Sequence, residues 1–173
     1  MNDSSYEPLK SSGANKCFGC SPVNPYGLQM TFLGNRKDVC SYITVPRHMC
    51  GWNKLVHGGI ISVILDEIMS WAALHVYKKI VLTKSMTVEF IKPVSITHEL
   101  KALGRPVKTM GRHEALVEGE VCDADGEICA KASGTFVLLN PKMAKRMGIV
   151  DDDGLKGIEN ILNPSVHFDP NGI

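Results

Sequence analysis

The stretch HGGIISVILDEIMSWAALHVY, residues 57–77, decides the fold of this chain. Its apolar residues go nearly all the way round a helix that starts after the HGG triplet and runs to about Tyr77. A helix that is apolar on most sides must be wrapped by other elements, so we expect a buried central helix. Because its most apolar part, residues 60–76, contains Asp66, Glu67 and His75, we expect it to be too short and too charged to span a bilayer.

Downstream of this helix the apolar period changes to two, which is typical of strands. Four strands are predicted, over residues 84–90, 98–107, 114–121 and 127–139, and Asp125-Gly126 is a strong hairpin signal between the last two. Simple alternation groups Lys84 with Met86 and Val88 on one face and leaves Thr83 off that face. Upstream, residues 28–33 and 39–45 are short strand-like runs separated by Gly34-Asn35.

Consecutive hairpins imply an antiparallel sheet, and one helix that is apolar all round implies that the sheet curls around it. The fold class is therefore α+β. The 173 residues suit one domain, with a flexible N-terminal arm at 1–16, a folded unit at 17–139 and a C-terminal tail at 140–173. Glycines and prolines, among them Pro164 and Pro170, punctuate the tail, which has room for one or two short helices.

The charge balance gives no reason to expect nucleic acid or a membrane as a partner, because the net charge is only +1. The N-terminal residues lack the basic and apolar regions of a signal peptide. We therefore expect a cytoplasmic protein with reduced thiols.

The motif HGGII at 57–61, followed by Asp66-Glu67, resembles the signature of hotdog-fold thioesterases. It resembles in particular the phenylacetyl-CoA thioesterase-like branch of the 4-hydroxybenzoyl-CoA thioesterase type. The segments CFGC at 17–20 and NPYGL at 24–28 are similar to a motif that precedes many such domains, and FIKPV at 90–94 and DADGE at 123–127 look like the matching strand end and hairpin. The resemblance covers roughly residues 17–139. It implies the hotdog fold, an antiparallel sheet wrapped around one long central helix, and an acyl-CoA thioesterase activity.

Thioester hydrolysis needs a positioned water, a base and donors for the carbonyl oxyanion. The first N–H groups of a helix have no internal partner, and Gly58 and Gly59 let a flat thioester approach that backbone closely. We expect the Gly59 N–H to bind the oxyanion and His57 to shape the loop or to hydrogen-bond near the thioester. Asp66 is the base candidate, because it lies in a polar stripe of an otherwise apolar helix. The resemblance implies that an acid at this position acts as general base or nucleophile, and the sequence leaves that choice open.

Five further residues are candidates for substrate binding. Ser70, one turn beyond Asp66, and Thr83, at the start of the next strand, could hold the water. Asn53 could contact the substrate or be a turn residue. Lys108 and Arg112 flank a turn and are candidates for the phosphates of coenzyme A, which is part of the substrate, so that no separate cofactor is expected.

The spacing of the two catalytic groups predicts an oligomer. Gly59 and Asp66 are seven residues apart, which is about 10 Å along one helix, whereas a water must attack from roughly 3–3.5 Å. Two antiparallel helices meeting across a two-fold axis would bring Gly59 of one chain near Asp66 of the other. We expect a homodimer with two composite sites. The resemblance implies the same arrangement, in which dimers often pair into tetramers.

Two other features have competing interpretations. Glu67 lies about 100° round the helix from Asp66 and is expected to be a salt-bridging or structural residue, although an exchange of roles stays open. No metal site is expected at Cys17 and Cys20, because zinc requires four ligands and the chain has no second CxxC motif. His48 and Cys50, or a partner chain, could complete one; otherwise the motif is a turn packed against the dimer or the acyl pocket.

The main alternative function is a non-hydrolytic hotdog protein, either an acyl-CoA-binding module or a dehydratase, since a fold does not fix a reaction.

Overall fold

The computed structural model describes residues 5–10, 16–96 and 98–162. In chain order its elements are β1 (Glu7–Leu9), β2 (Phe32–Gly34), β3 (Val39–Thr44), the 3-10 helix η1 (Arg47–Met49), α1 (Gly58–Tyr77), β4 (Ile80–Phe90), β5 (Glu99–Met110), β6 (Glu114–Cys122), β7 (Ile128–Leu139), α2 (Pro141–Arg146) and α3 (Asp152–Leu162).

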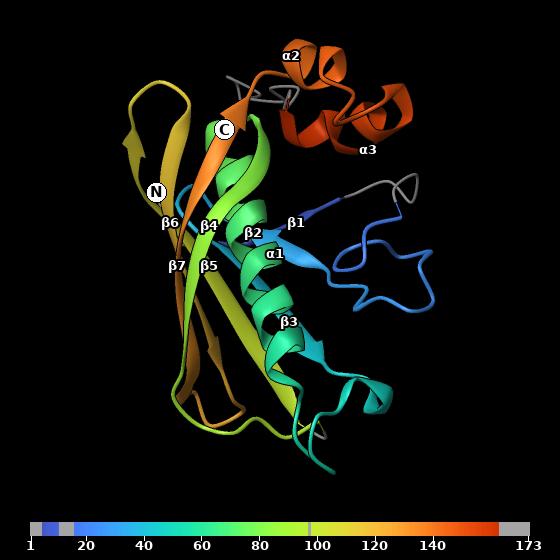
Figure 1. Ribbon diagram of the computed structural model, residues 1–173, viewed down its shortest axis with the longest axis vertical. Helices are drawn as coiled ribbons and strands as arrows, with labels where there is room; N and C mark the ends of the chain where they lie inside the picture. The colour runs from blue at the N-terminus through green and yellow to red at the C-terminus, as the bar shows by residue number, and fades with distance from the viewer. Residues whose placement is uncertain (1–4, 11–15, 97, 163–173) are drawn as a thin grey trace, which may run out of the picture.

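The strands form a single sheet in the order β1-β2-β3-β5-β6-β7-β4, and every pair of neighbours is antiparallel. The sheet curves along the length of α1, which lies against its concave face (Figure 1). The α+β class, the antiparallel sheet and the single long helix are confirmed, and the arrangement is the hotdog fold. Since α1 connects β3 to β4, it carries the chain across the three central strands and leaves β4 at one edge of the sheet.

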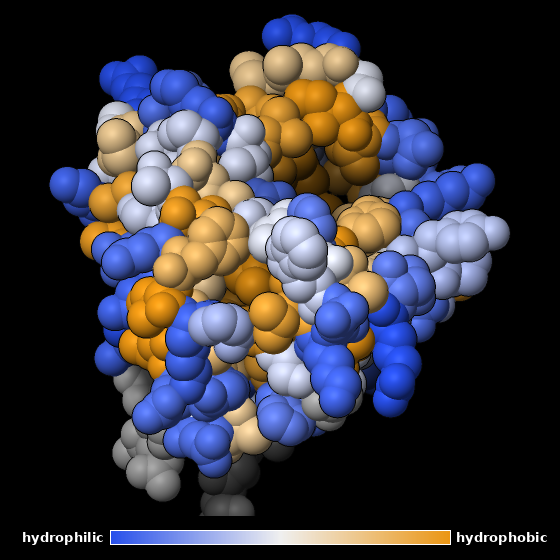
Figure 2. All heavy atoms as spheres, turned by 60° about the horizontal axis from the view of Figure 1, so that its bottom comes forward, coloured by the Kyte–Doolittle hydropathy of each residue, from blue (hydrophilic) through white to orange (hydrophobic). Residues whose placement is uncertain are grey.

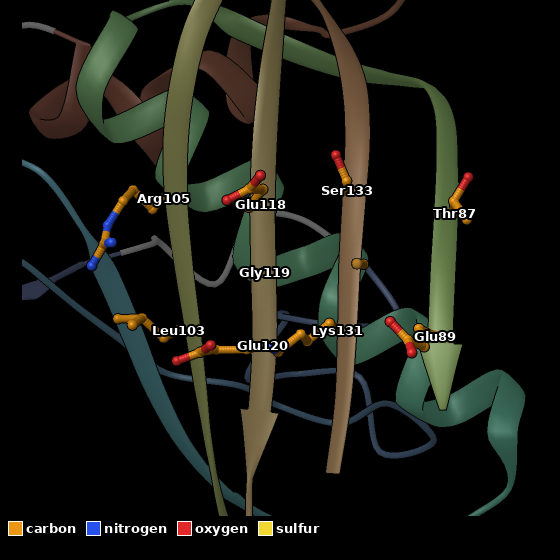
Figure 3. A pocket seen from close by; sticks show the side chains of 10 residues that line it. Thr87, Glu89, Leu103, Arg105, Glu118, Gly119, Glu120, Lys131 and Ser133 are labelled. Atoms are coloured by element: carbon orange, nitrogen blue, oxygen red, sulfur yellow. The ribbon is translucent and has the colours of Figure 1, made fainter. Parts of the chain in front are cut away.

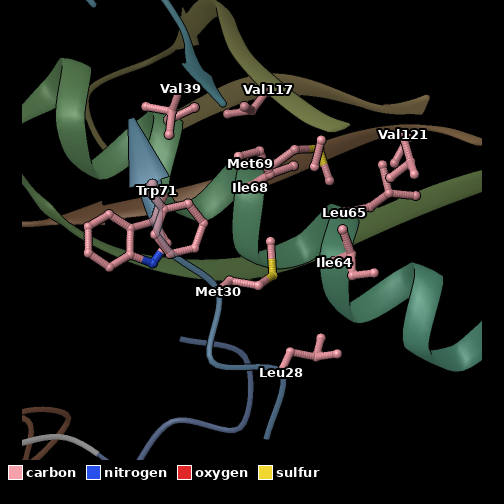
Figure 4. Close-up of a cluster of buried hydrophobic side chains, with 14 of the residues drawn as sticks. Leu28, Met30, Val39, Ile64, Leu65, Ile68, Met69, Trp71, Val117 and Val121 are labelled. Carbon is pink, nitrogen blue, oxygen red and sulfur yellow. The ribbon is translucent and has the colours of Figure 1, made fainter. Parts of the chain in front are cut away.

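The core forms where α1 packs onto the sheet. Figure 4 shows Leu65, Ile68 and Met69 of α1 on the side of Val117 and Val121 of β6, whereas Ile64 lies toward Leu28 and Met30. All four residues of α1 are fully buried. The helix backbone approaches β5 so closely that a Cβ at Gly104 would overlap the carbonyl of Ile68. Burial of this kind stabilises the fold by about 25 cal/mol for each Å² of apolar surface removed from water, so the helix is held mainly by its packing.

The length of α1 corrects one expectation from the sequence. The helix has 20 residues, and by length and composition alone it could cross a membrane. The expectation that the segment is too short for this was wrong, because the helix begins at Gly58 and not at residue 60. The sheet nevertheless gives its apolar residues a protein environment, and nine of its 20 residues, all between Ile61 and Leu74, are buried.

Strand β4 contains an irregularity that simple alternation misses. Thr83 pairs with Phe136, and Ser85 pairs with the adjacent Thr135, so that Lys84 is an extra residue in a β-bulge. The Lys84 side chain forms an ion pair with Glu114 and is exposed, with 2.6 Å between the charged atoms. Grouping Lys84 with the core-facing residues of this strand was therefore wrong.

Both ends of the chain contribute structure beyond the predicted strands. Residues 7–9, inside the segment expected to be a flexible arm, pair with β2 as strand β1. In the tail, Asn140 caps α2 by accepting a hydrogen bond from the Met143 N–H at 2.7 Å, and Ile161 and Leu162 of α3 join the core cluster. The tail thus packs against α1 through α3, while Pro164 and Pro170 lie outside the described residues.

Candidate active site

Asp66 lies at mid-length of α1 on the side that faces β4. The Thr83 hydroxyl donates a hydrogen bond to Asp66 Oδ1 at 2.6 Å. Asp66 is half-buried and Thr83 is exposed, so the pair is open to water. The bond occupies one carboxylate oxygen and leaves Oδ2 to accept a proton from a water molecule.

The β-bulge explains how Thr83 reaches Asp66. Thr83 pairs with Phe136, Met86 pairs with Gly134 and Val88 pairs with Ala132, and paired residues of neighbouring strands point to the same face. Phe136 is fully buried beneath α1, so this is the helix-facing side. The prediction that Thr83 lies off the face of Met86 and Val88 was wrong, because a bulge changes the parity of every residue before it.

The start of α1 is capped by its own histidine. The His57 side chain accepts a hydrogen bond from the Gly59 N–H, with 2.9 Å between Nδ1 and N, and the His57 carbonyl accepts from Ile60 N–H at 2.8 Å. His57 and Gly59 are exposed, and Gly58 lies against the ring of Phe90. In this conformation the expected oxyanion donor already has a partner, which is the ring of its N-cap residue.

The two serines that share the polar side of α1 with Asp66, Ser62 and Ser70, do not form a hydrogen-bond network that leads to Asp66. Ser62 donates its hydroxyl hydrogen bond back to the Gly58 carbonyl at 3.0 Å. Ser70 is half-buried one turn beyond Asp66. Gly59 and Asp66 remain about 10 Å apart along the axis of the same helix.

Apolar side chains are exposed around the helix start. Trp52 is 83% exposed, Phe90 54% and Ile91 48%. Figure 2, which brings this end of the molecule forward, shows hydrophobic side chains breaking the polar surface. Asn53 lies in the same loop, is exposed and has a left-handed backbone with φ of 41°, which is typical of a turn residue.

Lys108 and Arg112 lie at the other end of the sheet from Gly59. Both are exposed near the β5–β6 hairpin, where Met110 pairs with Glu114. Glu114 pairs in turn with Val137, which pairs with Leu82 at the beginning of β4, so the hairpin lies beside the end of α1 (Figure 1). Within one chain, Lys108 and Arg112 therefore lie at the same end of the sheet as Thr83 and at the opposite end from Gly59.

A groove of about 470 Å³ lies on the face of the sheet turned away from α1 (Figure 3). Charged side chains from four strands line it, and they are Glu89, Arg105, Glu118, Glu120 and Lys131. It contains none of the residues predicted for the site, and the sheet separates it from Asp66.

The environment of Glu67 is a feature that the sequence did not predict. Glu67 Oε1 and Cys17 Sγ are hydrogen-bonded at 3.0 Å, and one ligand atom from each of Cys17, Cys20 and Glu67 lies within 4.8 Å of the others. Burial, together with the neighbouring Cys17, raises the pKa of Glu67 to about 8. The hydrogen bond with Cys17, and then burial, raises the pKa of the Cys20 thiol.

The ion pairs between described residues do not include Glu67, so of its two expected roles, salt-bridging or structural, only the structural one has support there. His48 and Cys50, the residues considered as partners of the CxxC motif, are not part of the cluster either. One signal in the sequence could have pointed to Glu67. The small Gly19 inside the CxxC motif permits a close approach, and a Cβ there would overlap the Glu67 side chain.

Comparison with known proteins identifies relatives of this arrangement. Residues 53–130, from the loop before α1 into β7, match the family model of the thioesterase superfamily. An uncharacterized protein of Schizosaccharomyces pombe is 31% identical over 101 residues, which are 56% of this chain and 57% of the yeast protein. The match thus spans little more than half of that relative.

Three solved structures share the fold. A thioesterase superfamily protein aligns with a TM-score of 0.65 and 22% identity, over 70% of this chain and 60% of its own. The PaaI protein from the phenylacetic acid degradation operon of E. coli aligns with a TM-score of 0.59 and 16% identity, over 65% and 81%. A hypothetical thioesterase of Streptococcus pneumoniae, solved with coenzyme A, aligns with a TM-score of 0.56 and 17% identity, over 61% and 80%. At these identities the likeness shows the hotdog fold.

Proposed function

We propose that the chain hydrolyses acyl-CoA thioesters to a free acid and coenzyme A, because it has the hotdog fold and its residues 53–130 match the family model of the thioesterase superfamily. The observation that carries this proposal is the hydrogen bond between the Thr83 hydroxyl and Asp66. It fixes a carboxylate on a mostly buried helix while leaving that carboxylate accessible to water, which is the requirement for a base that activates water.

The reaction then runs in two steps. Asp66 Oδ2 takes a proton from a water molecule whose oxygen attacks the thioester carbonyl, and the negative charge moves to the carbonyl oxygen. When the tetrahedral intermediate collapses, the C–S bond breaks and the sulfur of coenzyme A leaves with the proton that Asp66 had taken. Direct attack by Asp66, with an anhydride intermediate, is the alternative use of the same carboxylate.

The partner that supplies the oxyanion donor is a second copy of this chain. Strand β4 is an edge strand of 11 residues, and within the described residues its outer edge has no paired strand. A long open edge is a template for pairing with another chain. A two-fold axis beside β4 brings two α1 helices together, so that Gly59 of one protomer can serve Asp66 of the other.

In this scheme the His57 side chain occupies the oxyanion donor, the Gly59 N–H, until substrate binds. Its Nδ1 accepts the Gly59 N–H in the structure, so the thioester oxygen replaces the imidazole when the ring turns outward. The exchange substitutes one acceptor for another, and the N–H keeps a hydrogen bond throughout. Gly58, at the very start of the helix, and Asn53, in the preceding loop, lie where the acyl group enters.

The phosphates of coenzyme A are assigned to Lys108 and Arg112 of the chain that contributes Asp66. Strand β5 lies three strand spacings from β4, which is about 14 Å, and coenzyme A is long enough to cover that distance. The half-buried Ser70 is assigned to the far side of the water site.

The relatives support the substrate class. The Streptococcus pneumoniae protein has been solved with coenzyme A, and separately with one aspartate or one threonine replaced by alanine. In this chain an aspartate and a threonine are hydrogen-bonded to each other. The PaaI protein comes from a phenylacetic acid degradation operon, which supports an aryl-acyl substrate of the phenylacetyl-CoA thioesterase-like branch, as do the exposed Trp52 and Phe90 at the helix start.

Release of free thiol from a panel of aryl- and medium-chain acyl-CoAs tests the activity. We expect the purified full chain to cleave at least one of them, with aryl-acyl groups preferred. Tight binding without cleavage would identify a non-hydrolytic binding module, and hydration chemistry in place of thiol release would identify a dehydratase.

Mixing two inactive variants tests the composite site. Gly59→Pro removes the donor N–H in the first helical turn, where proline is tolerated, and Asp66→Asn removes the base. Mixed dimers of the two should regain one working site, and light scattering of the same samples distinguishes a dimer from a dimer of dimers. If subunit exchange is complete and activity does not return, the two groups act within one chain.

A further inference from the structure

We propose that Cys17, Cys20 and Glu67 form a binding site for a divalent metal ion of the zinc class, with water as the fourth ligand. This site is separate from the Asp66–Thr83 pair and does not depend on the proposed function. The three residues come from two distant parts of the chain, and one ligand atom from each lies within 4.8 Å of the other two.

The spacing of these atoms suits a tetrahedral ion. Zinc binds thiolate sulfur at about 2.3 Å and carboxylate oxygen at about 2.1 Å, so ligand atoms of one tetrahedral site are about 3.6–3.8 Å apart. The contact between Cys17 Sγ and Glu67 Oε1 is 3.0 Å, and it is a hydrogen bond that the Cys17 thiol donates to the carboxylate. A metal ion would displace that proton and move the two atoms apart by less than an ångström.

The chemistry of the donors favours a soft or borderline cation. Two sulfurs and one carboxylate oxygen select zinc over calcium or magnesium, which prefer oxygen alone. Cys17 Sγ also accepts a hydrogen bond from the Gly19 N–H at 3.3 Å. Donors of this kind orient metal-bound thiolates and stabilise their charge.

A bound divalent ion would add positive charge beside the three acidic groups. No ion pair between described residues reaches Glu67, and the adjacent Asp66 adds a further acid. An ion of charge +2 would balance two thiolates, and its bonds would replace the thiol protons.

The loop that carries the cysteines is held in place against α1. Leu28 N–H donates to the Phe18 carbonyl and Met30 N–H donates to the Gly19 carbonyl, each at 2.9 Å. The Asn24 side-chain amide donates to the Lys16 carbonyl at 3.2 Å. The absence of a Cβ at Gly19 lets this loop lie directly on Glu67. The ligands are thus pre-organised, and a bound ion would tie residues 17–30 to the middle of the helix.

The fourth position follows from the exposure of the site. Cys17 and Glu67 are only partly buried, so a water molecule can complete the tetrahedron. Three protein ligands with one open position is an established zinc arrangement.

Cobalt substitution of the full chain tests the site. The reduced, chelator-treated protein is titrated with Co²⁺ alone, and thiolate-to-cobalt charge-transfer absorption is recorded in the near ultraviolet. We expect saturation at one Co²⁺ per chain, loss of the band when Zn²⁺ is added in equal amount, and a rise in melting temperature with Zn²⁺.

Two matched pairs of variants decide the ligand set. Loss of a residue that only hydrogen-bonds a metal ligand lowers metal affinity by up to roughly 100-fold. Glu67→Gln and Cys17→Ser should each weaken Zn²⁺ binding by more than this. The controls Asp66→Asn and Cys50→Ser should bind Zn²⁺ as the wild type does. If Cys17→Ser does not fold, Glu67→Gln against Asp66→Asn still decides, because both replace a carboxylate by an amide on the same helix.

Three results would overturn the proposal. One is a cobalt spectrum without thiolate charge transfer, and another is equal Zn²⁺ affinity in Glu67→Gln and Asp66→Asn. The third is a Cys17–Cys20 disulfide in the protein as purified under reducing conditions, found by thiol counting and mass spectrometry, which would make the motif a redox pair.

Discussion

Asp66 and Glu67 are neighbours in sequence and carry the same functional group, yet α1 gives them opposite surroundings. Asp66 faces the edge strand, where the Thr83 hydroxyl binds it and water has access. Glu67 lies beneath the CxxC loop, where Cys17 binds it and burial raises its pKa to about 8. A step of one residue turns the helix by about 100°, and that rotation separates a candidate for chemistry on substrate from a candidate for metal binding.

The largest expected effect separates the two carboxylates by their role in catalysis. Asp66→Asn should lower kcat by roughly 10²- to 10⁴-fold, because it removes a general base and keeps the shape of the side chain. Glu67→Gln should stay within about 10-fold of the wild type, since its carboxylate does not touch the proposed water. Steady-state thiol release measures both. A large loss in Glu67→Gln with a small loss in Asp66→Asn would exchange the two roles.

A steric change tests how closely the CxxC loop lies on Glu67. Gly19→Ala places a Cβ into the Glu67 side chain and should destabilise the fold by about 1–3 kcal/mol, as measured by urea unfolding. The same substitution made in a Glu67→Ala background is the control, because the overlapping atoms are then gone. An equal loss of stability in both backgrounds would mean that the loop does not rest on Glu67.

The hydrogen bond on the other carboxylate should have a smaller effect. Thr83→Val keeps the shape of the side chain and removes the donor to Asp66, so kcat/KM should fall by about 10-fold, the equivalent of roughly 1–1.5 kcal/mol. Thr83→Ser retains the hydroxyl and should retain most of the activity. Equal rates for the valine and serine variants would show that Asp66 does not need this bond.

The smallest expected effect is the pH dependence of stability that comes from His75, which lies further along α1 than the two carboxylates. Burial lowers the pKa of His75, its Nε2 bonds the Asn35 carbonyl at 2.7 Å, and its Nδ1 is buried without a described partner. The folded state therefore binds its proton less readily than the unfolded state, and stability should fall as pH drops through about 6.5.

Because His75 is only half-buried, the free energy of unfolding should change with pH by well under the maximum of about 1.4 kcal/mol per pH unit. Urea unfolding between pH 7.5 and 5.5 measures it, and His75→Gln should give a flatter profile. If the wild-type and variant profiles are parallel, His75 does not govern the stability in this pH range.

The sequence predicted the fold because its signals were strong and local. A helix apolar on every side has few possible environments, and four alternating strands joined by short turns can hardly form anything except an antiparallel sheet. Local reasoning failed where a single residue changed the register. The bulge at Lys84 moved Thr83 onto the helix-facing side, and alternation alone could not show it, since no glycine or proline marks the position.

In the candidate site, too, some features can be predicted from the sequence and others depend on the tertiary structure. Asp66 and the HGG start of α1 can be recognised in the sequence, because a carboxylate within an apolar helix and two glycines at a helix start are unusual there. The bond from Gly59 to the His57 ring depended on the rotamer of one side chain, and the cluster of Cys17 and Glu67 joined residues 50 positions apart.

The sequence by itself determined the helix, the strands and which residues carry reactive groups, because period, turn residues and side-chain chemistry are local properties. Only the tertiary structure decided which of the adjacent acids meets threonine and water and which meets two thiols. The physical reason is that the partners of Asp66 and Glu67 are set by how α1 is rotated against a bulged edge strand and the N-terminal loop. That rotation results from the packing of the whole core.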